Sequence, residues 1–154
     1  MISAVRYCVT LLVLTVYYGS KLILAALFGV PFRPGGVYDE APRRWARLLL
    51  KTNRLTVETQ GLDRLRPGQP YVFAANHFSF VDAWVLADVL PGSVRFLSKR
   101  GLAWVPLLGA AIKAAGHIFV DRTNLQSALS SYDQAARVVR SGCSAAVFAE
   151  GTRS

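Results

Sequence analysis

The longest apolar stretch of the chain lies near its beginning. Residues 7–27 are 21 in number, and Lys21 is the only charged one among them. As a single helix rising ~1.5 Å per residue, the stretch is roughly 32 Å long, close to the ~30 Å hydrocarbon core of a bilayer. We therefore expect a membrane anchor. It forms either one spanning helix, or two shorter helices that break at Gly19-Ser20-Lys21 and return within one leaflet.

A cleaved signal peptide and a buried core helix are two further interpretations of this stretch. Arg6 precedes the apolar region, as in a signal peptide, but residues 25–28 offer no clean small-residue cleavage pattern. Basic residues flank the stretch on both sides, at Arg6 and Arg33, so the positive-inside rule does not orient it. The pattern favours an anchor that stays on the protein.

A connector and a basic helix follow the apolar stretch. Residues 30–36 are dense in proline and glycine and are expected to form the connector. Residues 41–50 have a helical pattern in which basic side chains alternate with leucines and Trp45; the basic residues here are Arg43, Arg44, Arg47 and Lys51. This helix either packs against the domain with a solvated face or lies on anionic lipid, and the neighbouring apolar stretch favours the lipid.

The rest of the chain alternates short apolar runs with longer helical patterns. Strands are expected at residues 55–59, 71–75, 94–97, 118–120 and 145–149, and helices at residues 83–90, 102–115 and 124–140. Asn124 is a candidate cap for the last helix, and Gly142 is expected to end it. Strands that alternate with helices imply crossover connections. The expected fold is therefore α/β, with a mostly parallel sheet flanked by helices after a membrane-embedded helical segment.

Composition and charge narrow the class of protein. The chain has 154 residues, of which 53% are hydrophobic, and this fraction excludes a disordered chain. A formal charge of +9 combined with a mean hydropathy of +0.32 indicates a membrane surface with anionic headgroups. Nucleic acid is disfavoured as a partner, because no recognised binding motif is present and the aromatic residues cluster in apolar runs. The two cysteines, Cys8 and Cys143, form no disulfide framework.

Candidate functional residues directly follow three of the expected strands. Ligands of parallel sheets bind at these carboxyl ends of the strands. After residues 71–75 come His77 and Asp82, which can meet only if His77 lies in the turn and Asp82 lies near the start of the next helix. A carboxylate on one imidazole nitrogen raises the basicity of the other, which suits a general base. The alternative is a surface histidine beside an aspartate that caps the helix.

Two arginines follow the other two strands. Arg122 follows residues 118–120 and Arg153 follows residues 145–149, and we expect these strands to be neighbours. Two guanidinium groups converging on one edge favour a phosphorylated acceptor. Alternatively, Arg122 pairs with Asp121 and Arg153 is solvated. The sequence has no nucleophile elbow, metal-ligand cluster or glycine-rich nucleotide motif, so a basic His77 is expected to activate a hydroxyl of the substrate.

Three motifs together resemble those of the glycerolipid acyltransferases, the family of 1-acylglycerol-3-phosphate acyltransferases. Residues 76–82, NHFSFVD, resemble the H-x4-D block of the family, and residues 116–122, GHIFVDR, resemble its second block. Residues 148–154, FAEGTRS, resemble the third block, with Ala149 in place of the usual proline. The residues from Ser98 to Gly109 are also similar to those between the first two blocks. The resemblance covers residues 55–154, and the blocks follow in the family's order.

The resemblance implies a membrane-bound enzyme of phospholipid biosynthesis with an active site that faces the cytoplasm. Such an enzyme moves a fatty acyl group from acyl-CoA or acyl carrier protein to the hydroxyl of a lysophosphatidic-acid-like acceptor, and it needs no metal or other cofactor. It implies that His77 is the general base and that Asp82 orients it. The residues implied to hold the acceptor phosphate are Arg122 and Arg153, with Lys99 as a weaker candidate, and those implied to shape the acceptor pocket are Glu150, Gly151 and Thr152.

The resemblance also bears on the extent of the chain. The family continues beyond its third block with more strands and a fourth, proline-containing block, whereas this sequence ends at Ser154. We therefore expect a membrane segment and connector over residues 1–34 and a partial acyltransferase domain over residues 35–154, with a sheet that is incomplete at its C-terminus. The alternative function is a non-catalytic, lipid-binding remnant of such an enzyme.

Overall fold

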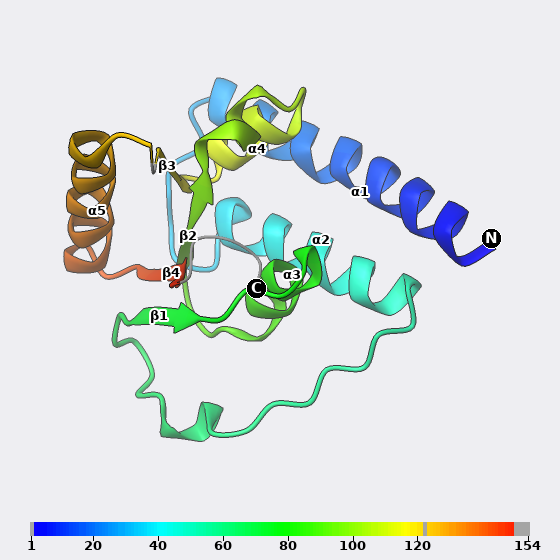
Figure 1. Ribbon diagram of the computed structural model, residues 1–154, viewed down its shortest axis with the longest axis horizontal. Helices are drawn as coiled ribbons and strands as arrows, with labels where there is room; N and C mark the ends of the chain where they lie inside the picture. Colours follow the sequence, from blue (N-terminus) through cyan, green and yellow to red (C-terminus); the bar gives the residue numbers. More distant parts are fainter. Residues whose placement is uncertain (1, 122, 150–154) are drawn as a thin grey trace.

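The computed structural model describes residues 2–121 and 123–149. The helices are α1 (Ile2–Leu27), α2 (Val37–Thr52), α3 (Phe80–Val89), α4 (Leu108–Ala114) and α5 (Leu125–Arg140), with short 3₁₀ helices η1 (Leu62–Arg64) and η2 (Arg100–Trp104). The strands are β1 (Val72–Ala75), β2 (Val94–Lys99), β3 (Ile118–Val120) and β4 (Ser144–Phe148). Figure 1 shows α5 on one face of the sheet and α1 to α4 on the other.

The four strands form one parallel sheet in the order β1-β4-β2-β3. The α/β class and the parallel sheet are therefore confirmed. One expectation about the sheet is wrong: β3 and β4, which precede Arg122 and Arg153, are not neighbours. Strand β4 is inserted beside β1, with Ala146 opposite Phe73, so that β2 separates it from β3.

Helix α1 is continuous from Ile2 to Leu27, so the expected alternative of a break at Gly19 is wrong. Gly19 instead permits close packing, because a Cβ there would lie 3.3 Å from Leu107 Cγ in the segment before α4. Side chains three or four residues apart pack inward along the helix, and they are Tyr7, Leu11, Leu14, Tyr18, Leu22 and Ala25. Within the described part of the chain, α1 is the one helix long and apolar enough to cross a membrane, with a mean hydropathy of 1.7.

Helix α2 lies between α1 and α3, and its basic side chains bind protein groups. Arg43 donates to the carbonyl oxygens of Leu90 and Gly92 at 2.8 and 2.9 Å, and these carbonyls follow the end of α3. Arg47 pairs with Asp88 of α3 at 2.8 Å. Both arginines thus bind a helix C-terminus, where cations are favoured. The structure supports the packed-helix interpretation of residues 41–50 over the lipid-bound one.

Two expected elements differ from the structure. Residues 55–59 are not a strand, because Val57 packs against the cluster around Trp84 and no described strand pairs with them. The expected helix over residues 102–115 is interrupted, and η2 and α4 are separate. Pro106 lacks an N–H, and Leu107 adopts a left-handed φ of 63°, so the chain turns there and places Leu107 against α1.

The remaining elements follow the sequence pattern closely. Asn124 caps α5 by accepting from the Ser127 backbone N–H at 3.1 Å, and Gly142 follows the helix with a φ of +93°, which suits glycine. The inner face of α5 packs on the sheet through Ala128 and Ala135. The expected strand at residues 71–75 also forms, as β1. These observations confirm the predicted helix and strand.

A buried ion pair ties the connector to the sheet. Arg95 of β2 donates from Nη1 to Asp39 Oδ1 of α2 at 2.6 Å, and the two side chains are only 7% and 3% exposed. The other carboxylate oxygen of Asp39 accepts from the Gly35 backbone N–H at 2.9 Å and from the Ser93 hydroxyl. The Arg95 guanidinium lies 5.6 Å from the centre of the Phe32 ring. The connector after α1 is therefore held against the amino-terminal end of β2.

Candidate active site

His77 and Asp82 meet at the carboxyl end of β1. His77 lies in the turn after the strand and Asp82 lies in the first turn of α3, and His77 Nδ1 is 3.2 Å from Asp82 Oδ2. This is the geometry that the sequence required for the pair to form. The pairing is confirmed, and the helix-capping alternative is also correct in part, because Asp82 accepts from the Ser79 backbone N–H at 2.7 Å.

Local hydrogen bonds fix the charge of Asp82. Burial raises the pKa of the Asp82 carboxyl, but the backbone N–H groups of Ser79 and Phe78 and the contact with His77 outweigh it, so the pKa lies below its ordinary value of 3.8. An ionised carboxylate only accepts hydrogen bonds, so His77 Nδ1 must carry the proton. The lone pair of a neutral His77 is then on Nε2, so this nitrogen is the one able to accept a proton.

The lowered pKa of Asp82 predicts how the pair responds to acid. Because the pKa of Asp82 is lower in the folded chain than its ordinary value of 3.8, the charged carboxylate stabilises the folded state at pH values above 3.8. This stabilisation is lost as the pH falls through the pKa of the folded chain. We expect the stability difference between wild type and Asp82→Asn to be constant above about pH 5 and to shrink below it. Denaturant unfolding measured across pH checks this, and a difference that grows on acidification would contradict it.

The first residue of the third motif, Phe148, contacts His77. The imidazole ring stacks on the ring of Phe148, the last residue of β4, with centroids 4.0 Å apart and planes tilted by 22°. This contact follows from β4 lying beside β1, which the sequence did not predict. In the sequence, Phe148 is only the first residue of the third motif, and no signal marks it as a neighbour of His77.

The described residues cover the expected phosphate-binding set only in part. Lys99 ends β2 and is exposed at the same edge of the sheet. Asp121 follows β3, and its carboxylate pairs with Arg100 at 3.2 Å and accepts from Thr123. Arg100 is therefore a partner of Asp121 that sequence reasoning missed. Five expected residues lie outside the described ones, namely Arg122, Glu150, Gly151, Thr152 and Arg153.

His117, the other histidine, has a different role. It precedes β3, and its Nδ1 accepts from the Phe96 backbone N–H at 3.1 Å. Desolvation in the interior, together with the nearby Arg95 charge, lowers the pKa of His117 to about 3, so the ring is neutral at physiological pH. It lies at the amino-terminal edge of the sheet, whereas His77 follows the carboxyl end of β1. His117 is a structural acceptor rather than a second base.

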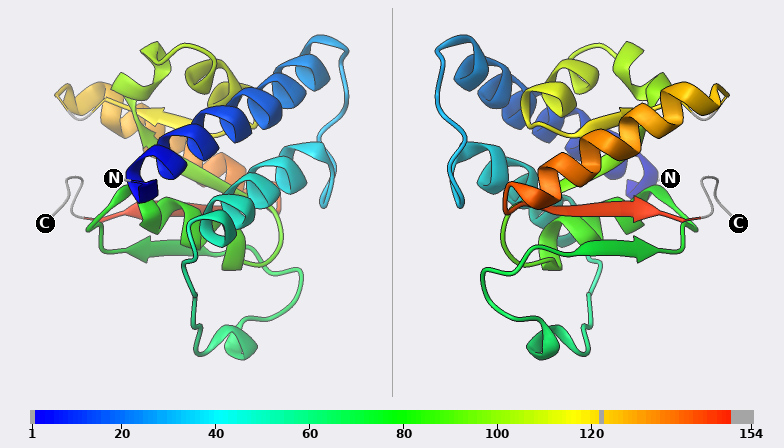
Figure 2. Two further views of the ribbon diagram at one scale, coloured as in Figure 1. Left: turned by 90° about the vertical axis from the view of Figure 1, so that its right-hand side faces the viewer. Right: turned by 90° about the vertical axis from the view of Figure 1, so that its left-hand side faces the viewer.

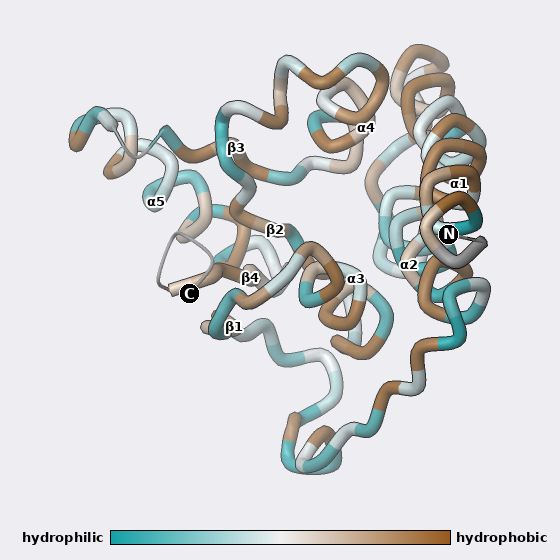
Figure 3. The backbone as a smooth tube through the Cα atoms, turned by 45° about the vertical axis from the view of Figure 1, so that its right-hand side comes forward, coloured by the Kyte–Doolittle hydropathy of each residue, from teal (hydrophilic) through white to brown (hydrophobic). Residues whose placement is uncertain are grey.

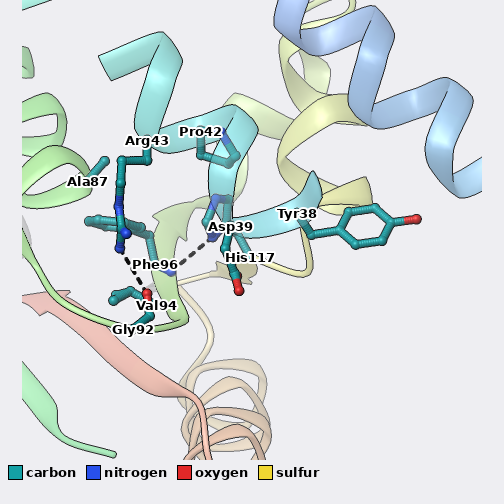
Figure 4. Close-up of a pocket in the computed structure, with 9 residues that line it drawn as sticks. All are labelled: Tyr38, Asp39, Pro42, Arg43, Ala87, Gly92, Val94, Phe96 and His117. Carbon is teal, nitrogen blue, oxygen red and sulfur yellow. Dashed lines mark hydrogen bonds between the residues drawn. The ribbon is translucent and has the colours of Figure 1, made fainter. Parts of the chain in front are cut away.

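His117 also lines two small cavities. The first, with about 280 Å³ of empty volume, lies between α2 and the start of β2, and Figure 4 shows the hydrogen bonds of His117 and Arg43 beside it. The second, with about 410 Å³, is an apolar hollow among α1, α2 and α4. Neither is lined by His77 or Asp82. No group of three potential metal-ligating side chains occurs among the residues that the structure describes.

The sequence of this chain is similar to those of known acyltransferases. A family model described as Acyltransferase matches residues 56–154. The 1-acyl-sn-glycerol-3-phosphate acyltransferase alpha of Homo sapiens is 37% identical over 142 residues, which cover 89% of this chain and 50% of that protein. The 1-acyl-sn-glycerol-3-phosphate acyltransferase of Cocos nucifera is 30% identical over 138 residues, which cover 87% of this chain and 43% of that protein.

A solved structure has the same fold. The crystal structure of the 1-acyl-sn-glycerophosphate acyltransferase PlsC from Thermotoga maritima matches 96% of this chain and 64% of its own, with a TM-score of 0.68 and 19% identity. The family match covers well over half of this chain, and the chain belongs to the acyltransferase family. The resemblance seen in the motifs is thereby confirmed. The chain spans about half the length of the curated relatives it matches.

Proposed function

We propose that this protein transfers a fatty acyl group from a thioester, acyl-CoA or acyl carrier protein, to the hydroxyl of a lysophosphatidic-acid-like glycerol phosphate acceptor. The observation that carries the proposal is the His77–Asp82 pair, 3.2 Å apart at the carboxyl edge of a parallel sheet. Relatives that are 37% and 30% identical bear the name 1-acyl-sn-glycerol-3-phosphate acyltransferase, which supports this choice of acceptor.

The reaction needs one base and no covalent enzyme intermediate. His77 Nε2 takes the proton of the acceptor hydroxyl as its oxygen attacks the thioester carbonyl carbon. The tetrahedral intermediate collapses, the carbon–sulfur bond breaks, and the imidazolium returns the proton to the thiolate. Asp82 stabilises the imidazolium through Nδ1 and keeps the ring oriented. The products are an ester and a free thiol, and no metal or redox cofactor is consumed.

The acceptor phosphate is proposed to bind at the same edge of the sheet. Lys99 at the end of β2 is exposed there, and a lysine is a suitable point charge for a phosphate. The motif residues Arg122 and Arg153 are proposed to bind the phosphate, and Glu150, Gly151 and Thr152 are proposed to shape the pocket around the glycerol. Their positions in the second and third motifs, which follow β3 and β4, support these roles.

Helix α1 is proposed to hold the protein at a membrane. The active site is proposed to face the cytoplasm. The outward face of α1 is exposed and apolar, at Val5, Val9, Leu12, Val13, Val16, Leu24 and Leu27. Its inward face packs on the domain from Tyr7 to Ala25, and Trp45 of α2 donates to Thr15 at 3.1 Å. A helix bound along its length to a basic domain is better suited to lie in the interface than to cross the bilayer.

An acceptor-dependence assay tests the proposed function. Membranes that contain the full-length protein are supplied with acyl-CoA, and release of the free thiol is followed with and without a lysophosphatidic acid. We expect release to depend on that acceptor and to be much slower with a monoacylglycerol, which lacks the phosphate. Equal release with both acceptors would overturn phosphate recognition. No release above background with acyl-CoA or acyl carrier protein would favour the non-catalytic, lipid-binding alternative.

A further inference from the structure

The most exposed large hydrophobic side chain in the described part of the chain is Trp104, the last residue of η2, at 83%. The other two tryptophans are packed inside, with the rings of Trp45 and Trp84 6.0 Å apart in the cluster between α2 and α3. Tryptophan has a large apolar ring with one polar N–H, and such side chains favour places where an apolar phase meets water. The exposure of Trp104 therefore indicates that this side chain contacts a partner outside the chain.

The fold holds Trp104 in this position through close packing. A Cβ on Gly109 of α4 would overlap the backbone of Ala103, so η2 lies directly against α4. The Val105 backbone N–H donates to the Leu102 carbonyl at 3.2 Å, and the Val105 carbonyl accepts from the Gly109 N–H at 2.9 Å. Trp104 is thus presented by a tightly packed turn, and Val105 beside it is exposed as well.

The segment that follows this turn packs against α1. Leu107, two residues after Val105, contacts α1 at Gly19. Figure 3 shows hydrophobic colour along α1 and again in the segment that leads into α4. Figure 2 shows that the amino-terminal end of α1 lies on the side of the molecule where the strands end. Lys99, whose side chain is exposed, immediately precedes η2 in the chain, so the turn follows a basic residue.

We propose that Trp104 and Val105 form, together with the outward face of α1, a single lipid-contact surface whose partner is the headgroup–acyl boundary of an anionic bilayer. The inference rests on the proposed membrane location of α1 and adds a second contact from the α/β part. Trp104 enters the interface, and Lys99 remains among the anionic headgroups. Because η2 directly follows β2, this contact brings the carboxyl edge of the sheet, with His77, toward the lipid.

The test compares tryptophan emission from wild type and Trp104→Phe in the full-length protein. The difference between the two spectra belongs to Trp104. On mixing with vesicles of phosphatidylcholine and phosphatidylglycerol, this difference is expected to shift to shorter wavelength and to be quenched by lipids brominated on the acyl chains. Trp104→Ala is expected to weaken vesicle binding on the order of tenfold. Leu125→Ala, at a similarly exposed position of α5 on the opposite face, is expected to leave binding unchanged.

Each other outcome overturns the inference in a recognisable way. If the protein binds vesicles but brominated lipid leaves the Trp104 emission unchanged, the α1 location stands and the second contact is wrong. If acrylamide fails to quench Trp104 in the absence of lipid, a protein segment or a second copy covers it instead. If the protein does not bind vesicles at all, both the second contact and the proposed membrane location are wrong.

Discussion

Replacing His77 by alanine is expected to slow acceptor-dependent thiol release by about 10²–10⁴-fold, the usual contribution of a positioned general base. The imidazole is the one base within hydrogen-bond distance of Asp82 among the described residues, and its Nδ1 is already committed to that carboxylate. Without it, the acceptor hydroxyl must lose its proton to water. The effect should fall on kcat, because the proposed role of the side chain is to remove the reacting proton.

The second histidine of the chain offers a matched control for that experiment. His117 is half-buried at the opposite edge of the sheet and accepts from the Phe96 backbone N–H. The variant His117→Gln is expected to alter stability but to keep the activity of each folded molecule near that of wild type. Circular dichroism of both variants gives the folded fraction. Equal thiol release by His77→Ala and wild type would sink the base assignment.

Asp39→Ala is expected to lower the free energy of unfolding by about 3–5 kcal/mol, the cost of leaving a buried charge without its partner. Arg95 would keep its guanidinium in a site that is 7% exposed, and its contact with Asp39 Oδ1 at 2.6 Å would be lost. The Gly35 N–H and the Ser93 hydroxyl would lose their acceptor as well. Denaturant unfolding in detergent measures the change.

Glu40→Ala provides the comparison, because Glu40 is the next residue in the first turn of α2. Glu40 pairs with Arg44 at 3.2 Å, but those side chains are 40% and 63% exposed. Exposed pairs contribute about 0–1 kcal/mol, so this variant is expected to stay close to wild type. If the two variants lose equal stability, the buried pair does not hold the connector in the way we describe.

The two predicted effects are separable because they act at opposite edges of the sheet. Asp39 and Arg95 lie where β2 begins, and His77 lies where β1 ends. In a parallel sheet these are different edges, so the ion pair affects the attachment of the connector and the imidazole affects the proposed reaction. Asp39→Ala at a temperature where it remains folded should therefore retain the chemistry of wild type.

Several elements were predictable because their signals are local. The period of 3.6 residues in α5 reports one apolar face, and the Asn124 cap needs only its own neighbours to form. The contact between His77 and Asp82 was conditional on a turn followed by a helix start, and both are encoded within six residues. For the same reason, Asp82 could be both a partner of His77 and part of the helix cap.

Other features were not predictable because they depend on residues far apart in the chain. The alternation at residues 55–59 is that of a strand, but Val57 packs against helices instead of pairing in a sheet. Arg95 and Asp39 are each ordinary charged residues in the sequence, and only their burial against each other shows their importance. The local pattern indicates which face of a helix or strand is apolar, but it does not indicate which other segment covers that face.

By itself, the sequence determined that this is a basic α/β protein with an apolar N-terminal helix and with the three motifs of an acyltransferase in order. Each of these is a property of composition or of near neighbours. Only the tertiary structure decided that β4 lies between β1 and β2, which separates β3 from β4 and stacks Phe148 on His77. Strand order is a choice among pairings of similar local energy, and it is settled by how the helices and side chains pack over the whole sheet.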